Sequence, residues 1–296
     1  MEAYLASLDL SPRSRDTYRK AVGRFLDWVE QTGRPITALR REDVLAYKDE
    51  LLKSCTPATA AAYLTAVRSL FSFLHASTGY PDICRDVKNP KAARGHTKDA
   101  LSASEARGLL EAMPRGTEAQ LRNYAVVCLL LHTGLRTAEA AGANLEDVRR
   151  IAGAPVLYVK GKGHDAKDDF VKLTKAPLEA LSAYLRAREA REGILDGAAP
   201  LFASDSPRNR GERLSVRSLS RICKDALRRA GHDSPRLTAH SLRHTAVTCA
   251  LEAGATIREA QQMARHASPL TTERYAHDLR RLEDAAEDKL EALLTG

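Results

Sequence analysis

The chain has 296 residues, which is long enough for more than one domain with its own core. Its 46 Lys and Arg residues outnumber its 38 Asp and Glu residues, so the formal net charge is +8 and a polyanionic partner is favoured. No apolar run in the sequence is long enough to span a bilayer, and the early acidic residue argues against a signal peptide. The composition therefore disfavours a membrane or secreted protein.

The five cysteines are odd in number and form no Cys-x-x-Cys pair. Several of them fall in apolar helical runs, where a free cysteine behaves as a small core residue. We therefore expect reduced cysteines and a cytoplasmic protein.

Residues 1–81 predict a small helical bundle. Ser11 and Thr56 each place an N-cap residue immediately before a proline, which is favoured at the first helical position. A further helix is expected over residues 41–53. A bundle with a basic, solvated surface is the simplest interpretation of this part of the chain.

Residues 82–99 predict an interdomain linker. They lack apolar periodicity and contain an Asn-Pro pair among several basic residues. Such charges are common in any solvated linker. If the linker joins two domains around a nucleic acid, however, its charges would lie close to phosphates.

Residues 100–296 predict a second, mainly helical domain. Ser102 and Glu105 form a capping box at its start. Residues 121–131 are apolar on most faces, which indicates a buried helix that ends at Gly134.

A β-hairpin is predicted inside this second domain. Residues 155–160 and 169–173 are β-branched or alternating, and a polar, Gly-rich turn separates them. Lys160, Lys162 and Lys167 all lie on the hairpin, and each could be an ordinary solvated turn lysine. The acidic residues and the histidine of the turn fit its composition, so we predict no metal site there.

Another helix is expected over residues 177–191, and a strongly basic segment follows it. Residues 208–236 hold nine basic residues against three acidic ones, and helical spacing places several of them on one face. This segment is the best candidate for contact with a phosphate backbone. The DNA-contact residues that we predict are Arg208, Arg210, Arg213, Arg217, Arg221, Lys224, Arg228 and Arg229.

The segment from residue 238 to residue 275 places unusual side chains on successive helices. His240 and Arg243 are three residues apart, so both project from one face of a helix. His266 follows the next helix, and Tyr275 lies on a third. Such side chains make a poor hydrophobic core, but they can form an anion site with a hydroxyl directed at it.

This pattern resembles the tyrosine recombinase (phage-type integrase) family. That family carries a His-x-x-Arg pair, then a His or Trp, then a Tyr nucleophile, and the four residues just named match these positions in order. It also has an Arg in a Thr-Gly-Leu-Arg turn, here Arg136, and a Lys in a hairpin, here Lys162 in its Gly-Lys-Gly tip. The ordered set is specific, and it covers nearly the whole chain.

The resemblance implies a fold and a division of the chain. It implies a mainly α fold with a small β-hairpin in the catalytic domain, arranged as a two-domain, C-shaped DNA clamp. Residues 1–81 would be the helical, SAM-like core-binding domain, residues 82–99 the linker, and residues 100–296 the catalytic domain with a C-terminal tail helix. One departure lies at Ala264 and Arg265, where the family commonly has Leu-Gly.

The resemblance also implies which residues handle the phosphate. Arg136 and Arg243 would fork onto the non-bridging oxygens and neutralise the charge of the transition state. Glu139 would hold the Arg136 guanidinium in place. His266 would hydrogen-bond the scissile phosphate.

The remaining roles concern proton transfer. Tyr275, with an ordinary pKa of about 10, needs a cationic site and a nearby base such as His240 to act as a nucleophile. Lys162 would protonate the leaving 5′-oxygen. The product is a 3′-phosphotyrosine and a free 5′-hydroxyl. Because one ester replaces another, resealing needs no cofactor and no metal.

The expected partners are double-stranded recombination sites, with a homotetramer assembled on paired sites and a possible accessory DNA-bending or activating protein. Strand exchange would pass through a Holliday junction, either in mobile-element integration and excision or in chromosome-dimer resolution. The expected location is the cytoplasm, at the nucleoid when bound to DNA. Residues 279–294 predict an amphipathic tail helix that docks on its own domain or on a neighbouring protomer.

Two alternatives remain open at this point. A type IB topoisomerase would use similar residues as a monomer, although the small helical first domain and the tail favour a recombinase. A catalytically silent DNA-binding regulator would keep the basic surface but has no reason to keep the catalytic set together.

Overall fold

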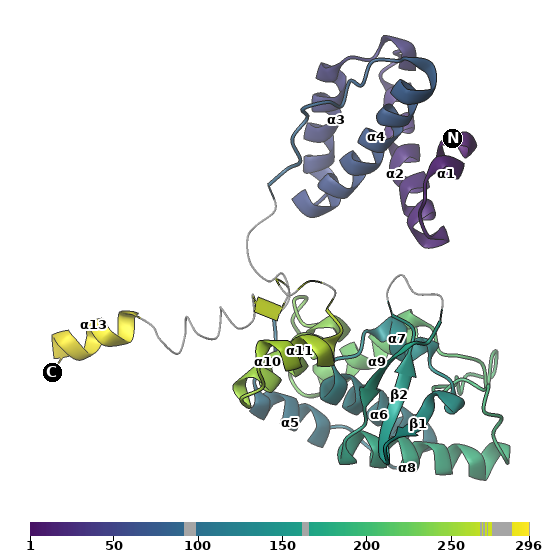
Figure 1. The fold of residues 1–296 in the computed structure, drawn as a ribbon, viewed down its shortest axis with the longest axis vertical. Coiled ribbons are helices and arrows are strands. Elements are labelled where there is room, and N and C mark those ends of the chain that lie inside the picture. The colour runs from purple at the N-terminus through teal and green to yellow at the C-terminus, as the bar shows by residue number, and fades with distance from the viewer. Residues whose placement is uncertain are drawn as a thin grey trace. The chain divides into compact units, whose positions relative to one another are not determined.

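The structure is a computed structural model that describes residues 1–91, 99–161, 166–266, 268, 270, 272–273 and 286–295. The chain divides into two units, residues 1–95 and residues 96–296. Each unit is mainly helical, and the second contains a small sheet (Figure 1). This confirms the predicted fold class.

In its described residues, 1–91, the first unit has four helices and a short 3₁₀ turn. They are α1 (Glu2–Ser7), α2 (Pro12–Gln31), η1 (Ile36–Ala38), α3 (Arg41–Ser54) and α4 (Pro57–Thr78). The Ser11 and Thr56 side chains cap α2 and α4, each accepting a backbone N–H at 3.3 Å. Phe25 packs edge-on against Tyr47 and Phe71, with ring centroids 5.0 and 5.8 Å away, and these rings form the centre of the core.

The start of the segment that we predicted as a linker belongs to the first unit. Cys84 and Val87 are buried in the aromatic core, and Arg68 donates a hydrogen bond to the Val87 carbonyl at 2.7 Å. Residues 92–98 lie outside the described part of the chain. The polar residues after Val87 are therefore the part that remains available as a linker.

The second unit is built around one buried helix. Its described helices are α5 (Ala103–Glu111), α6 (Glu118–Thr133), α7 (Thr137–Gly142), η2 (Leu145–Asp147), α8 (Lys175–Glu192), α9 (Val216–Arg229), α10 (Ala239–Glu252), α11 (Ile257–Ala264) and α13 (Ala286–Thr295). Helix α6 packs against α8, α9 and α10, and its residues from Ala125 to Leu130 are fully buried. The predicted capping box is present, with the Ser102 N–H donating to Glu105 at 2.8 Å.

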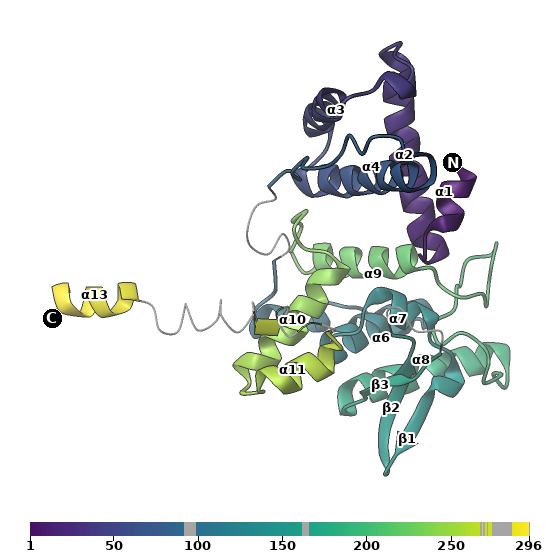
Figure 2. The same ribbon diagram turned by 45° about the horizontal axis from the view of Figure 1, so that its top comes forward.

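The sheet has three antiparallel strands in the order β1 (Val148–Ile151), β2 (Ala154–Val159) and β3 (Asp169–Lys172). Strands β2 and β3 are the predicted hairpin, and Val159 pairs with Asp169 at the end next to the connecting segment. Strand β1 escaped prediction because its four residues are half-buried or exposed and include two arginines. Figure 2 shows the three strands side by side.

The end of α6 sets the position of the site. Gly134 ends the helix in the left-handed region, at φ 61°, where a residue with a β-carbon is strained. The next residue, Leu135, is buried, so the chain turns through the core before α7 begins. Arg136 is the N-cap of α7 and is therefore fixed at the rim of the core.

Candidate active site

Arg136 and Glu139 are joined at the first turn of α7. The Glu139 carboxylate accepts the Arg136 backbone N–H at 2.8 Å and its Nη1 at 2.6 Å. The Arg136 Nη2 also donates to the Arg265 carbonyl at 3.3 Å. Arg136 is half-buried, whereas Glu139 is buried, so the carboxylate orients the guanidinium from the interior side.

Arg243 lies on α10 and is 2% exposed. Its Nη1 donates to the Gly134 carbonyl at 2.5 Å, and its Nη2 donates to the Ala264 carbonyl. These carbonyls belong to the ends of α6 and α11, where helix carbonyls lack an intrahelical partner. Arg243 thus joins two helix C-termini and is held beside the start of α7.

Arg265 joins the same cluster, although no motif in the sequence indicated it. It is the C-cap of α11 in the left-handed region, at φ 52°, and its side chain is 6% exposed. Its Nη2 donates to Glu139 at 2.6 Å, and its Nε lies 4.0 Å from Asp169 on β3. The available signal was its departure from the Gly of the family pattern.

His266 follows Arg265 and faces the same cluster. Its Nδ1 lies 2.8 Å from the Thr272 hydroxyl, and Thr272 is fully buried. The His266 backbone is held by Gln261, which bonds both its N–H and its carbonyl. These contacts fix the ring in one orientation.

Among the members of the predicted set that the structure describes, His240 is the exposed one. It lies in the first turn of α10, and its ring stands edge-on to that of His244 with centroids 4.5 Å apart. Lys162 and Tyr275 lie outside the described residues, so their predicted roles stay predictions. The alternative hairpin lysine, Lys167, forms an ion pair with the buried Asp147.

The electrostatics of the cluster are those of an anion site. Burial, followed by the charge on Arg136, lowers the pKa of Arg243 to about 9, with Glu139 opposing and Arg265 adding to the shift. Burial and the arginines, Arg243 first, lower the pKa of His266 to about 4. Burial alone would raise the pKa of Glu139, but Arg265 and Arg136 hold it below its usual value. At neutral pH Arg243 is therefore charged, Glu139 is ionised and His266 is neutral.

The predicted DNA-contact residues are exposed except for Lys224, which is half-buried, and three of them also bond to the protein itself. Arg213 donates to the carbonyls of Ala141 and Ala143, and Lys224 donates to the Ser234 carbonyl. Lys224 and Arg228 both pair with Asp233, at 3.2 and 3.1 Å.

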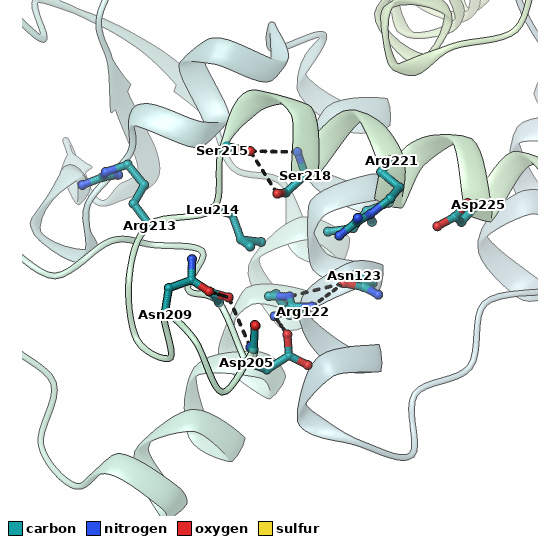
Figure 3. Close-up of a pocket in the computed structure, with 13 residues that line it drawn as sticks. Arg122, Asn123, Asp205, Asn209, Arg213, Leu214, Ser215, Ser218, Arg221 and Asp225 are labelled. Atoms are coloured by element: carbon teal, nitrogen blue, oxygen red, sulfur yellow. Dashed lines mark hydrogen bonds and ion pairs between the residues drawn. The ribbon is translucent and has the colours of Figure 1, made fainter.

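A polar cavity of about 440 Å³ lies beside the N-terminal end of α9. Figure 3 shows Arg221 of α9 at its wall and Arg122 of α6 facing Asp205. Arg122 donates to the Asp205 carboxylate at 2.7 Å and to the Ala203 carbonyl at 3.0 Å. These bonds hold the loop before α9 against α6, so the residues around this cavity help to position α9.

Two family models match the chain. The model described as the phage integrase family matches residues 99–281, and the model described as its N-terminal SAM-like domain matches residues 1–77. Tyrosine recombinase XerD of Corynebacterium glutamicum is 33% identical over 283 residues, which cover 90% of this chain and 88% of that protein. Among the described residues, no helix meets the length and hydropathy that a bilayer crossing requires.

Solved structures share the fold. The XerH site-specific recombinase bound to its palindromic difH substrate matches with a TM-score of 0.74 at 22% identity, covering 92% of this chain and 79% of that one. The lambda integrase tetramer bound to a Holliday junction matches with a TM-score of 0.68 at 16% identity, covering 93% and 75%. The chain belongs to the phage integrase family and is a tyrosine recombinase, an enzyme that breaks and rejoins DNA strands at specific sites.

Proposed function

We propose that Tyr275 attacks a DNA phosphodiester held by Arg136, Arg243 and His266. One observation carries this proposal: Arg136, Arg243 and His266, which lie far apart in the sequence, meet around the ends of α6 and α11. Arginine forks match the non-bridging oxygens of a phosphate, and these guanidiniums are oriented before any ligand arrives.

The neutral state of His266 suits a hydrogen-bond donor. With a pKa of about 4, the ring is uncharged at neutral pH and carries one proton. If Nδ1 accepts from the Thr272 hydroxyl, the proton is on Nε2, where it can point at a phosphate oxygen. The histidine then adds a donor without adding another cation to a crowded positive site.

Proton transfer in the proposal falls to His240 and Lys162. The exposed ring of His240 can reach solvent or a bound strand, which suits a base that accepts the tyrosine proton. Lys162 donates a proton to the leaving 5′-oxygen. The tyrosine oxygen forms a bond to phosphorus as the bond to the 5′-oxygen breaks, and attack by another 5′-hydroxyl reverses the step.

The proposed assembly is a homotetramer on paired double-stranded sites that passes through a Holliday junction. Residues 1–81 and 100–296 act as the two halves of the clamp. Segment 82–99 joins them, and its start packs in the core of the first unit. Arg208, Arg210, Arg217, Arg221 and Arg229 follow the phosphate backbone. The role is chromosome-dimer resolution or mobile-element movement, in the cytoplasm at the nucleoid, with a possible accessory protein.

The chemistry is tested by trapping the covalent intermediate. Wild-type protein with a nicked cognate site should give a DNA adduct that survives SDS, and Tyr275→Phe should give none because it lacks the attacking oxygen. Tyr124→Phe is the matched control, since it removes a hydroxyl elsewhere in the second unit. An undiminished adduct in the Tyr275 variant would assign the nucleophile to another residue.

A further inference from the structure

Arg265 is placed where it can change what Glu139 does to the active site. The carboxylate that orients Arg136 also carries a negative charge, buried 2.6 Å from the Arg136 Nη1. Alone, such a carboxylate would cancel most of the charge that Arg136 offers to a phosphate. Arg265 approaches the same carboxylate at 2.6 Å from the other side.

We propose that Arg265 is a positioning residue that neutralises Glu139, so that Arg136 and Arg243 both keep their charge for the scissile phosphate. The inference rests on the proposed function of those two arginines. Three guanidiniums and one buried carboxylate give the cluster a net charge of +2, and removal of Arg265 would leave +1. Asp169 is the next carboxylate, but it is partly exposed and 4.0 Å from Arg265.

The backbone conformation at Arg265 favours glycine, yet the chain carries arginine there. A left-handed conformation at φ 52° costs a residue other than glycine about 1 kcal/mol or more, and glycine adopts it freely. The guanidinium is nevertheless buried, and its Nε has no hydrogen-bond partner among the described residues. A strained backbone and a buried cation indicate that the charge itself is required at this point.

The same residue reaches Arg136 by a second route. The Arg265 carbonyl accepts a hydrogen bond from Arg136 Nη2 at 3.3 Å. Any residue at this position supplies that carbonyl, so the carbonyl contact does not depend on the side chain. The side chain adds the charge compensation and a hydrogen bond from Nη1 to the Met263 carbonyl at 2.9 Å, and only the first of these responds to a change of charge at Glu139.

The test is a charge-rescue series in the full-length chain. Arg265→Met keeps the length and the backbone strain but removes the charge, and we expect it to slow adduct formation about 10- to 100-fold. Adding Glu139→Gln restores the net charge of +2 and still leaves an acceptor for Arg136. The double variant should therefore form the adduct faster than Arg265→Met, by at least about tenfold.

Two further variants separate charge from folding. Arg265→Lys should stay close to wild type, whereas Arg265→Gly relieves the backbone strain and should still be slow. A scissile methylphosphonate has one negative charge fewer, so it should shrink the gap between Arg265→Met and wild type. These comparisons need only rates, and circular dichroism confirms that each variant is folded.

The outcomes decide between the ideas. A double variant no faster than Arg265→Met would overturn the compensation role and make Arg265 a structural residue. Equal rates for Arg265→Met and wild type would overturn it as well. Absence of any tyrosine adduct in the wild type would instead refute the proposed function, so the two failures are distinguishable.

Discussion

Replacement of Arg243 by methionine should remove DNA cleavage while leaving the fold almost as stable as before. The two hydrogen bonds to helix-end carbonyls are charge-assisted, and their loss costs about 3–6 kcal/mol in total. Methionine fills most of the vacated volume, so the cavity penalty is small.

An opposing term comes from the charge. The unfolded arginine is charged at neutral pH, and the folded site lowers the pKa of Arg243 from its ordinary value to about 9, so burying the charged form destabilises the fold. At about 1.4 kcal/mol per pKa unit, that penalty is about 5 kcal/mol, and methionine removes it. The two terms nearly cancel, and we expect a change in unfolding free energy within about 2 kcal/mol.

The assay is urea denaturation of the full chain, with and without inorganic phosphate. The only tryptophan, Trp28, lies in α2 of the first unit, so its fluorescence reports that unit while circular dichroism reports both. Phosphate that occupies the site should stabilise the wild-type second unit by about 1.4 kcal/mol for each tenfold increase above its dissociation constant. Arg243→Met should show no such slope.

Two results would refute this reasoning. A loss of more than about 4 kcal/mol in Arg243→Met would mean that its hydrogen bonds outweigh the buried charge, which makes it a net stabiliser of the fold. An unchanged response to phosphate would show that the anion binds elsewhere. Arg217→Met is the matched control, because Arg217 is an exposed arginine on α9.

Three further predictions follow from the same site. A 5′-bridging phosphorothioate needs little protonation on leaving, so it should rescue Lys162→Ala cleavage far more than Arg243→Ala cleavage, and rescue confined to Lys167→Ala would move the acid role to that lysine. The folded state lowers the pKa of His266 to about 4, so the unfolded state binds more protons between about pH 6.5 and pH 4, and stability falls as the pH is lowered through that range. His266→Gln should therefore lose less stability than wild type in that window, and equal losses measured by denaturation would contradict this. A chain truncated after Leu279 should bind one DNA site normally but fail to form the paired-site complex on native gels, and normal recombination would exclude a tail that links protomers.

The truncation is motivated by the apolar face of α13. Leu290, Leu293 and Leu294 are 55%, 79% and 73% exposed. A helix of this length is marginal in water unless it packs against something. The remaining part of the predicted tail lies outside the described residues.

Local signals in the sequence predicted most of the helices. Three helix starts were predictable from capping residues: Ser11 and Thr56, each followed by proline, and the capping box at Ser102. Each of these side chains accepts a backbone N–H that would otherwise lack a partner at the start of the helix. The end of α6 was predictable from a local signal as well, because Gly134 readily adopts the left-handed conformation that ends a helix. Strand β1 was missed because its sequence is short and Arg-rich and has no apolar pattern of its own. Its strand conformation is fixed by pairing with β2.

The sequence names the residues that we propose for the site, but it does not give their arrangement. The ordered motif named Arg136, Arg243 and His266, yet spacing alone could not show that Arg243 is buried between two helix ends. The role of Arg265 depends on a contact with Glu139 across 126 positions of the sequence, which no local pattern reveals. Long-range electrostatics of this kind need the folded chain.

The different partners of the two arginines that we propose for phosphate binding explain why a third arginine is useful. Arg243 is oriented by carbonyls at the ends of α6 and α11, and a helix C-terminus carries only about half a negative charge, so most of its positive charge is left for a ligand. Arg136 also donates to a helix-end carbonyl, that of Arg265, but it is oriented in addition by the full charge of Glu139. A carboxylate that orients an arginine competes with the phosphate for the positive charge of that arginine. A carbonyl that orients an arginine competes much less. A compensating cation is therefore useful at Arg136 and not at Arg243, and Arg265 lies beside the Glu139 carboxylate that orients Arg136.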